Sequence, residues 1–219
     1  MGTRLKPLPE QFSATVAELH RVAEEVVAPA RKPDNEIALE PTAGGFGTPE
    51  FEWEGAAHQV RVDGTELVRE TDGEQEREGL GVDAASADVL ARWYEFGREV
   101  LDRLRGEADV NEGATEPILW PEHFDVAIEM GEEAAGVRAT YGFSPGDENH
   151  SEPYAYVAPW AAQEAGEFWN ARGFGGAELG YAELLAAEDP GKAALDFMRS
   201  RRDALAQSSH TEKPTKEGQ

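Results

Sequence analysis

The sequence predicts an α+β fold in which antiparallel strands form two groups, with an N-terminal helix, a long central helix and C-terminal helices. Two observations lead to this prediction. Apolar residues recur at every second position in two regions, and at three- or four-residue spacing in the regions that flank and separate them. The predicted strands also follow one another along the chain, which favours antiparallel sheets over a doubly wound parallel sheet.

The first predicted helix covers residues 9–29. Pro9 stands near its start and Pro29 follows its last apolar turn. Its apolar residues, at helical spacing, are Phe12, Val16, Leu19, Val22 and Val26. We expect this amphipathic helix to bury that face against the core.

The first group of strands is predicted between residues 36 and 70. Alternating apolar and polar residues indicate three or four short strands there. Asp63 and Gly64 supply a hairpin turn, because glycine readily adopts the positive φ angles that such turns require. The segment 70–79, ETDGEQEREG, is highly charged, and we expect it to be a loop.

The second helix is predicted over residues 83–105. Asp83 or Ser86 is its candidate N-cap, and Gly106 is the candidate stop. Its apolar stripe consists of Val89, Trp93, Phe96, Val100 and Leu104.

The second group of strands is predicted after residue 117. Strict alternation occurs in residues 123–130, HFDVAIEM, and further strands are expected within residues 137–143 and 153–160. A helical turn within residues 177–187 and a final helix that starts at Pro190 complete the fold. In the strand 123–130 the predicted inward residues are Phe124, Val126, Ile128 and Met130, and the predicted outward residues are His123, Asp125, Ala127 and Glu129.

The length of 219 residues and a hydrophobic content of 40% are sufficient for a sizeable core. We expect a single α+β domain at residues 1–206, with possible halves at 1–106 and 117–206. The acidic, glycine-containing segment 106–116 is the candidate boundary between these halves. The polar composition of residues 207–219 predicts a disordered tail.

The chain is strongly acidic, with 44 acidic and 20 basic residues and a net charge of −24. Such a charge repels phosphate backbones and anionic lipids, so we expect neither a nucleic-acid partner nor a membrane partner. The sequence contains no cysteine, which excludes disulfides and thiolate metal ligands. No long apolar span or signal peptide is apparent, so a cytoplasmic location is expected. The sequence requires no cofactor.

Several motifs along the chain occur in a familiar order. They are LPEQFSATVAELHRV at 8–22, LWPEHFDVAIEM at 119–130, EPYAYVAPW at 152–160 and YAELLAAEDPGKAALDFMRSRRDAL at 181–205. Together they resemble an uncharacterised, largely actinobacterial family of bacterial domains of unknown function. The shared features include a Phe-Asp-Leu-Ala-like strand, here 124–127, and an Asp-Pro-x-x-Ala-x-Leu-x-Phe helix start at Asp189. The resemblance implies a single cytoplasmic α+β domain and no particular reaction.

Four polar residues, His123, Asp125, His150 and Glu152, are the candidate catalytic residues. If the strand 123–130 lies beside the strands that follow it, the outward His123 and Asp125 can meet the loop that carries His150 and Glu152. His123, Asp125 and His150 are also candidate metal ligands, because a mixed nitrogen and oxygen set suits Zn²⁺, Mn²⁺ or Fe²⁺. The alternative is an ordinary solvated strand and turn.

Four aromatic residues, Tyr141, Tyr154, Tyr156 and Trp160, are the candidate binding residues. Their rings offer stacking area and one polar group each, as expected of a cleft that binds a ligand. The alternative is that they form cross-strand pairs or part of the core.

These observations favour a ligand-binding domain with an aromatic and acidic groove near residues 120–160. Its partner is expected to be an unidentified small molecule or protein. One alternative is a small metal-dependent or acid–base hydrolase that uses His123, Asp125, His150 and Glu152. Another alternative is a protein-interaction module.

Overall fold

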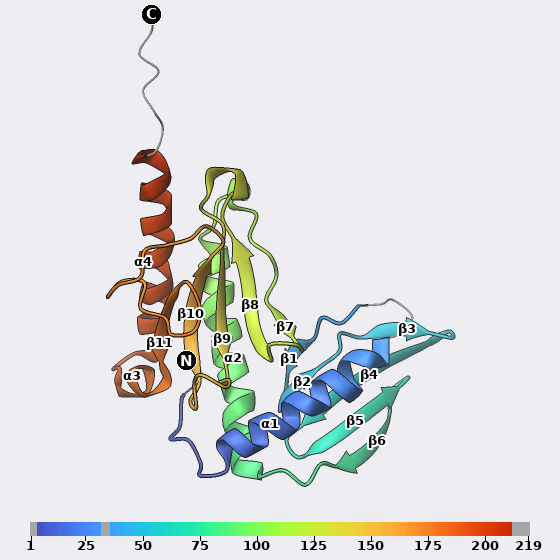
Figure 1. The fold of residues 1–219 in the computed structure, drawn as a ribbon. Coiled ribbons are helices and arrows are strands. Elements are labelled where there is room, and N and C mark those ends of the chain that lie inside the picture. Colours follow the sequence, from blue (N-terminus) through green and yellow to red (C-terminus); the bar gives the residue numbers. More distant parts are fainter. Residues whose placement is uncertain (1–3, 32–35, 212–219) are drawn as a thin grey trace, which may run out of the picture.

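The computed structural model describes residues 4–31 and 36–211, with side chains described as far as residue 207 (Figure 1). Helices and two antiparallel sheets make up this part of the chain, which confirms the predicted α+β class. A disordered tail was predicted at residues 207–219. Residues 207–211 continue the last helix, and residues 212–219 lie outside the described residues.

The first sheet has six strands. Its order is β1-β2-β4-β5-β6, and β3 pairs with the free part of β4. The strands are β1 (Glu40–Thr42), β2 (Gly45–Gly47), β3 (Phe51–Trp53), β4 (Ala56–Asp63), β5 (Glu66–Thr71) and β6 (Glu74–Gly79). The predicted β4–β5 hairpin is confirmed, with Gly64 at a φ of 61°, but its turn residues are Gly64 and Thr65, because Asp63 pairs with Glu66.

The charged segment 70–79 is a strand hairpin, so the prediction of a loop was wrong. Asp72 and Gly73 form its turn with φ angles of 49° and 85°, and β6 pairs with β5 along its length. Every residue of β6 is exposed, and Arg77 forms an ion pair with Glu66 across the two strands. Alternation cannot reveal such an edge strand, because neither of its faces is buried.

The helices begin and end close to the predicted residues. Helix α1 (Phe12–Val22) continues into a π-helical turn, η1 (Ala23–Val27), and a 3₁₀ turn, η2 (Ala28–Arg31). Helix α2 (Ala84–Gly106) begins after Asp83, whose carboxylate accepts hydrogen bonds from the backbone N–H and hydroxyl of Ser86 at 2.8 and 2.6 Å. Asp83 is therefore the N-cap, which decides between the two predicted candidates.

The second sheet is an antiparallel meander of five strands in the order β11-β10-β9-β8-β7. The strands are β7 (Ile118–Trp120), β8 (Asp125–Met130), β9 (Ala139–Ser144), β10 (Tyr154–Pro159) and β11 (Ala177–Gly180). The predicted helical turn at 177–187 was therefore wrong in its first part, which forms β11. The short helix α3 (Tyr181–Ala186) follows, and α4 (Pro190–Thr211) begins at Pro190 as predicted. The remaining elements are the 3₁₀ turns η3 (Val110–Glu112) and η4 (Glu133–Ala135).

One continuous hydrophobic core joins the two sheets. Helix α2 contacts strands of both sheets, as Figure 1 shows for the meander. The sheets also meet directly, because Leu39 and Leu119 exchange two backbone hydrogen bonds of 2.9 and 2.8 Å. The face of the meander toward α2 is aromatic: the ring of Phe143 packs against Trp93 at a centroid distance of 5.3 Å. Loops and a cavity lie on the opposite face of the meander.

Within the described residues, no helix combines the length and the apolar composition needed to cross a lipid bilayer.

Candidate functional site

A cavity of about 620 Å³ lies on the face of the meander opposite α2. Side chains alternate along a strand, so the residues between the core positions of β8, β9 and β10 point into it. These strand residues are Asp125, Thr140, Ser144, Tyr154, Tyr156 and Ala158. The remaining walls come from α1, from the β7–β8 turn and from two loops, and contribute His20, Glu122, His123, Gly146, Asp147, Glu148 and Phe174.

The floor of the cavity depends on a tyrosine that lies across a glycine. Tyr156 on β10 is the direct cross-strand partner of Gly142 on β9. A Cβ atom at position 142 would lie 2.5 Å from the Tyr156 ring, so only glycine lets the ring occupy this place. The Tyr156 hydroxyl thereby passes over β9 and donates a hydrogen bond to Asp125 on β8. Phe174 meets the Tyr156 ring edge-on at a centroid distance of 5.9 Å.

Asp125 is the most deeply buried ionisable group of the cavity, with only 5% of the residue exposed. Its Oδ2 accepts the hydrogen bond from Tyr156, whereas its Oδ1 has no hydrogen-bond partner among the described residues. Burial raises the pKa of Asp125, and the hydrogen bond from Tyr156, the nearby His123 and the backbone N–H of Asp125 itself offset only part of this rise. Burial also raises the pKa of Tyr156, and the charge of Asp125 raises it further.

The turn that presents His123 at the rim contains a strained residue. Phe124 has a φ of 52°, which is unusual for a bulky side chain. Its N–H donates to the Trp120 carbonyl at 2.7 Å, and its own carbonyl accepts a hydrogen bond from the buried Tyr94 hydroxyl at 2.7 Å. The His20 ring stacks on the Phe124 ring at 5.0 Å. These contacts hold the turn in a fixed position between the two sheets.

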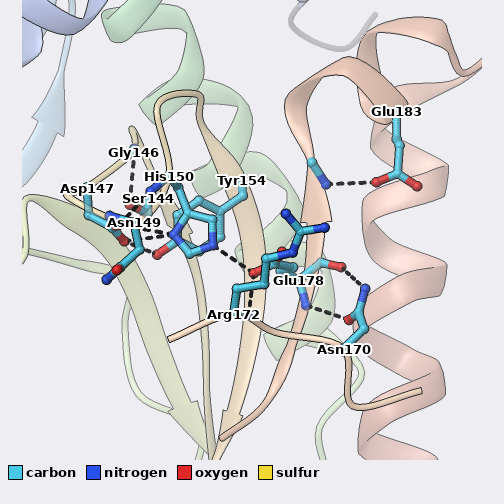
Figure 2. A network of polar contacts seen from close by, with 11 residues as sticks. Ser144, Gly146, Asp147, Asn149, His150, Tyr154, Asn170, Arg172, Glu178 and Glu183 are labelled. Carbon is cyan, nitrogen blue, oxygen red and sulfur yellow. Dashed lines mark hydrogen bonds and ion pairs between the residues drawn. The ribbon is translucent and has the colours of Figure 1, made fainter. Parts of the chain in front are cut away.

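The loop between β9 and β10 is organised around Asp147 (Figure 2). Its carboxylate accepts hydrogen bonds from the N–H groups of Asn149 and His150 at 2.7 and 2.9 Å, and from the Tyr154 hydroxyl at 2.6 Å. Burial alone would raise the pKa of Asp147, but the hydrogen bonds from Tyr154 and His150 lower it below its ordinary value. The ionised Asp147 carboxylate therefore holds this loop in place beside the cavity.

His150 connects this loop to the edge strand β11. Its Nδ1 lies 3.0 Å from Asp147 Oδ1, and its Nε2 lies 2.9 Å from Glu178 Oε2 (Figure 2). Burial lowers the pKa of His150, but the two carboxylates outweigh this effect and raise it above its ordinary value. The imidazolium form can donate to both carboxylates at once, so His150 acts as a clamp between the two segments.

The predicted catalytic set does not assemble. His123 and Asp125 line the cavity together, but His150 lines a smaller adjoining pocket of about 250 Å³, and Glu152 lines neither of them. Both ring nitrogens of His150 already face carboxylates, which leaves none for a metal or a substrate. Among residues 4–31 and 36–207, whose side chains are described, no three His, Asp or Glu residues are grouped to hold a metal ion, so the predicted set of His123, Asp125 and His150 is not formed.

Two of the four predicted binding aromatics reach the cavity. Tyr154 and Tyr156 line it, so both stay candidate binding residues. Tyr141 instead lies on the core face of β9, is 1% exposed and does not line the cavity. Trp160 follows the end of β10 and also lies outside the cavity, with the Arg138 guanidinium 5.0 Å from its ring centroid.

His20 and Phe174 are cavity residues that sequence reasoning did not assign. His20 belongs to α1, within the motif at 8–22 and far from the meander in sequence. Phe174 lies in the glycine-rich segment before β11, for which the sequence predicted no site.

No protein-family model matches this chain, and no curated protein or solved structure is significantly similar to it. The resemblance to an actinobacterial family therefore stays a prediction, and the function has to be inferred from the cavity itself.

Proposed function

We propose that the protein binds a small organic molecule in the cavity over β8, β9 and β10. The observation that carries this proposal is the state of Asp125, a nearly completely buried carboxyl group with one oxygen lacking a hydrogen-bond partner among the described residues. Buried polar atoms are almost always paired, because an unpaired one loses its hydration without compensation. A donor group of a bound ligand would pair with this oxygen.

The composition of the walls supports the same proposal. Small-molecule sites are concave, mostly apolar and aromatic, and contain a few fixed polar groups. Here Tyr154, Tyr156 and Phe174 supply the aromatic surface, and Asp125 supplies the fixed polar group. The volume of about 620 Å³ lies within the range of roughly 300–1,000 Å³ that is usual for such sites. A cytoplasmic role without a nucleic-acid partner remains part of the proposal, and the net charge of −24 supports the lack of a nucleic-acid partner.

A fragment screen by ¹H–¹⁵N NMR tests this function. Fragments that bind should shift the amide signals of β8, β9 and β10 together. Ala158→Phe places a ring inside the cavity and should abolish those shifts, whereas Ala134→Phe, at an exposed position of η4, should leave them unchanged. If no fragment in a chemically diverse library shifts the cavity residues, the protein does not have this function.

A second candidate function is acid–base catalysis by His123 and Asp125. It is favoured by one observation: the two side chains line the same cavity, and burial raises the pKa of Asp125, which favours a proton donor. A panel of ester, phosphoester and glycoside substrates tests it, with His123→Ala and Asp125→Asn as variants. Turnover that both variants reduce at least tenfold would support catalysis, and turnover unaffected by either would exclude it.

A further inference from the structure

We propose that the ligand of this cavity is an organic ammonium ion with an apolar body, whose N–H groups bind Asp125. This inference rests on the proposed function and specifies its ligand class. It follows from the charge of the walls, the unpaired oxygen of Asp125 and the aromatic rings around it.

The cavity is negatively charged. Four acidic residues line it, and among the described residues that form its walls there is no lysine or arginine. The four are Glu122, Asp125, Asp147 and Glu148. A concave acidic site in a protein with a net charge of −24 attracts cations and repels anions. No lysine or arginine of the described cavity walls is therefore available to pair with an anionic ligand.

The buried end of the cavity requires a hydrogen-bond donor. Asp147 is already paired with His150 and Tyr154, whereas the only side-chain hydrogen bond of Asp125 among the described residues comes from the Tyr156 hydroxyl to Oδ2. An ionised carboxylate only accepts hydrogen bonds, so its free Oδ1 calls for a donor. A cationic N–H makes a shorter and stronger bond to a carboxylate than a neutral O–H or N–H does.

The surrounding rings suit an organic cation. Tyr154, Tyr156 and Phe174 line the cavity beside Asp125. Aromatic faces attract ammonium groups through their quadrupoles, and they also cover an apolar ligand body. A divalent metal ion fits less well, because no group of three His, Asp or Glu residues is arranged to coordinate it within the described chain. Mg²⁺ and Ca²⁺ would both require more oxygen ligands than Asp125 provides.

The ionisation of Asp125 links this binding to pH. Burial raises the pKa of Asp125, so part of the free protein carries a protonated Asp125 as the pH falls toward that value. A bound ammonium ion favours the carboxylate and lowers this pKa again. Affinity for the ammonium ion should therefore increase as the pH rises through the pKa of Asp125, on which the facing Tyr156, His123 and Glu122 also act. A neutral ligand of the same shape should not show this increase.

Titration calorimetry with three probes of similar shape tests the inference. The probes are 2-phenylethylammonium, the neutral 2-phenylethanol and the anionic 3-phenylpropionate. We expect the ammonium ion to bind at least tenfold more tightly than either of the others, as a charge-assisted hydrogen bond implies. Asp125→Asn should remove this preference, whereas Asp109→Asn, which deletes a charge at an exposed position outside the cavity, should retain it.

If Asp125→Asn does not fold, binding measurements on the wild-type protein are sufficient to test the inference. Equal or tighter binding of the alcohol or the carboxylate, or an ammonium affinity that does not change with pH, would overturn the ammonium assignment. Fragments without an ammonium group that shift the cavity signals would then leave the proposed binding function standing. Failure of every probe and every fragment to bind the cavity would overturn both proposals.

Discussion

Gly142→Ala is expected to destabilise the protein by about 2 kcal/mol. The added Cβ would lie 2.5 Å from the Tyr156 ring and 2.6 Å from its hydroxyl oxygen, so the ring must move. Loss of the hydrogen bond from Tyr156 leaves the buried Asp125 without this donor, which costs about 1–3 kcal/mol of stability. Displacing the ring from its rotamer adds about 0.5–1.5 kcal/mol. Alanine also lowers the conformational entropy of the unfolded chain, which stabilises the folded protein by about 0.4–1 kcal/mol, because the φ angle of Gly142 is accessible to alanine.

Urea unfolding of a double-mutant cycle measures this effect. In a Tyr156→Val background, Gly142→Ala should no longer destabilise, because no ring lies over position 142. Gly79→Ala is the matched control: Gly79 is also a strand glycine, but an added Cβ would meet no atom within 4 Å. The reasoning would be refuted if Gly142→Ala behaved like Gly79→Ala, or if it destabilised the Tyr156→Val protein equally.

Three further outcomes follow from the same contacts. The pKa of Asp125 is raised on folding, so its contribution to stability is complete below the unfolded pKa of about 3.9 and is lost as the pH rises through the folded value. Asp125→Asn should consequently gain stability relative to wild type between pH 4 and pH 7 in urea melts, and a constant difference would contradict this. His150 also has a raised pKa, so its contribution is complete below about pH 6.5 and is lost above its folded value; His150→Gln should destabilise the protein more at pH 5.5 than at pH 9. Trp160→Ala should change ligand affinity less than about twofold in calorimetry, because Trp160 lies outside the cavity.

The sequence predicted the longer elements that bury one face. The α1 and α2 stripes and the alternation in β8 follow directly from burial against a common core. Strand β6 escaped prediction because it is exposed on both faces and is recognisable only by the Asp72-Gly73 turn. Residues 177–180 escaped because their strand is short and runs directly into α3.

The site was predictable only in part, because its contacts depend on register and on distant segments. Alternation placed Asp125 on the outward face, but it did not reveal that loops and Tyr156 bury that face. The position of Tyr156 over Gly142 requires knowing which residues of β9 and β10 are opposite each other. In the same way, the His150–Glu178 contact depends on the pairing of β10 with β11, which no local pattern specifies.

The most direct test of this account is a ¹³C NMR titration of the Asp125 carboxyl group, with and without 2-phenylethylammonium. We expect a pKa above the ordinary value of about 3.9 in the free protein and a lower pKa when the ammonium ion is bound. An ordinary pKa for Asp125 that the ammonium ion leaves unchanged would show that this carboxyl group is neither buried as described nor the anchor of a ligand.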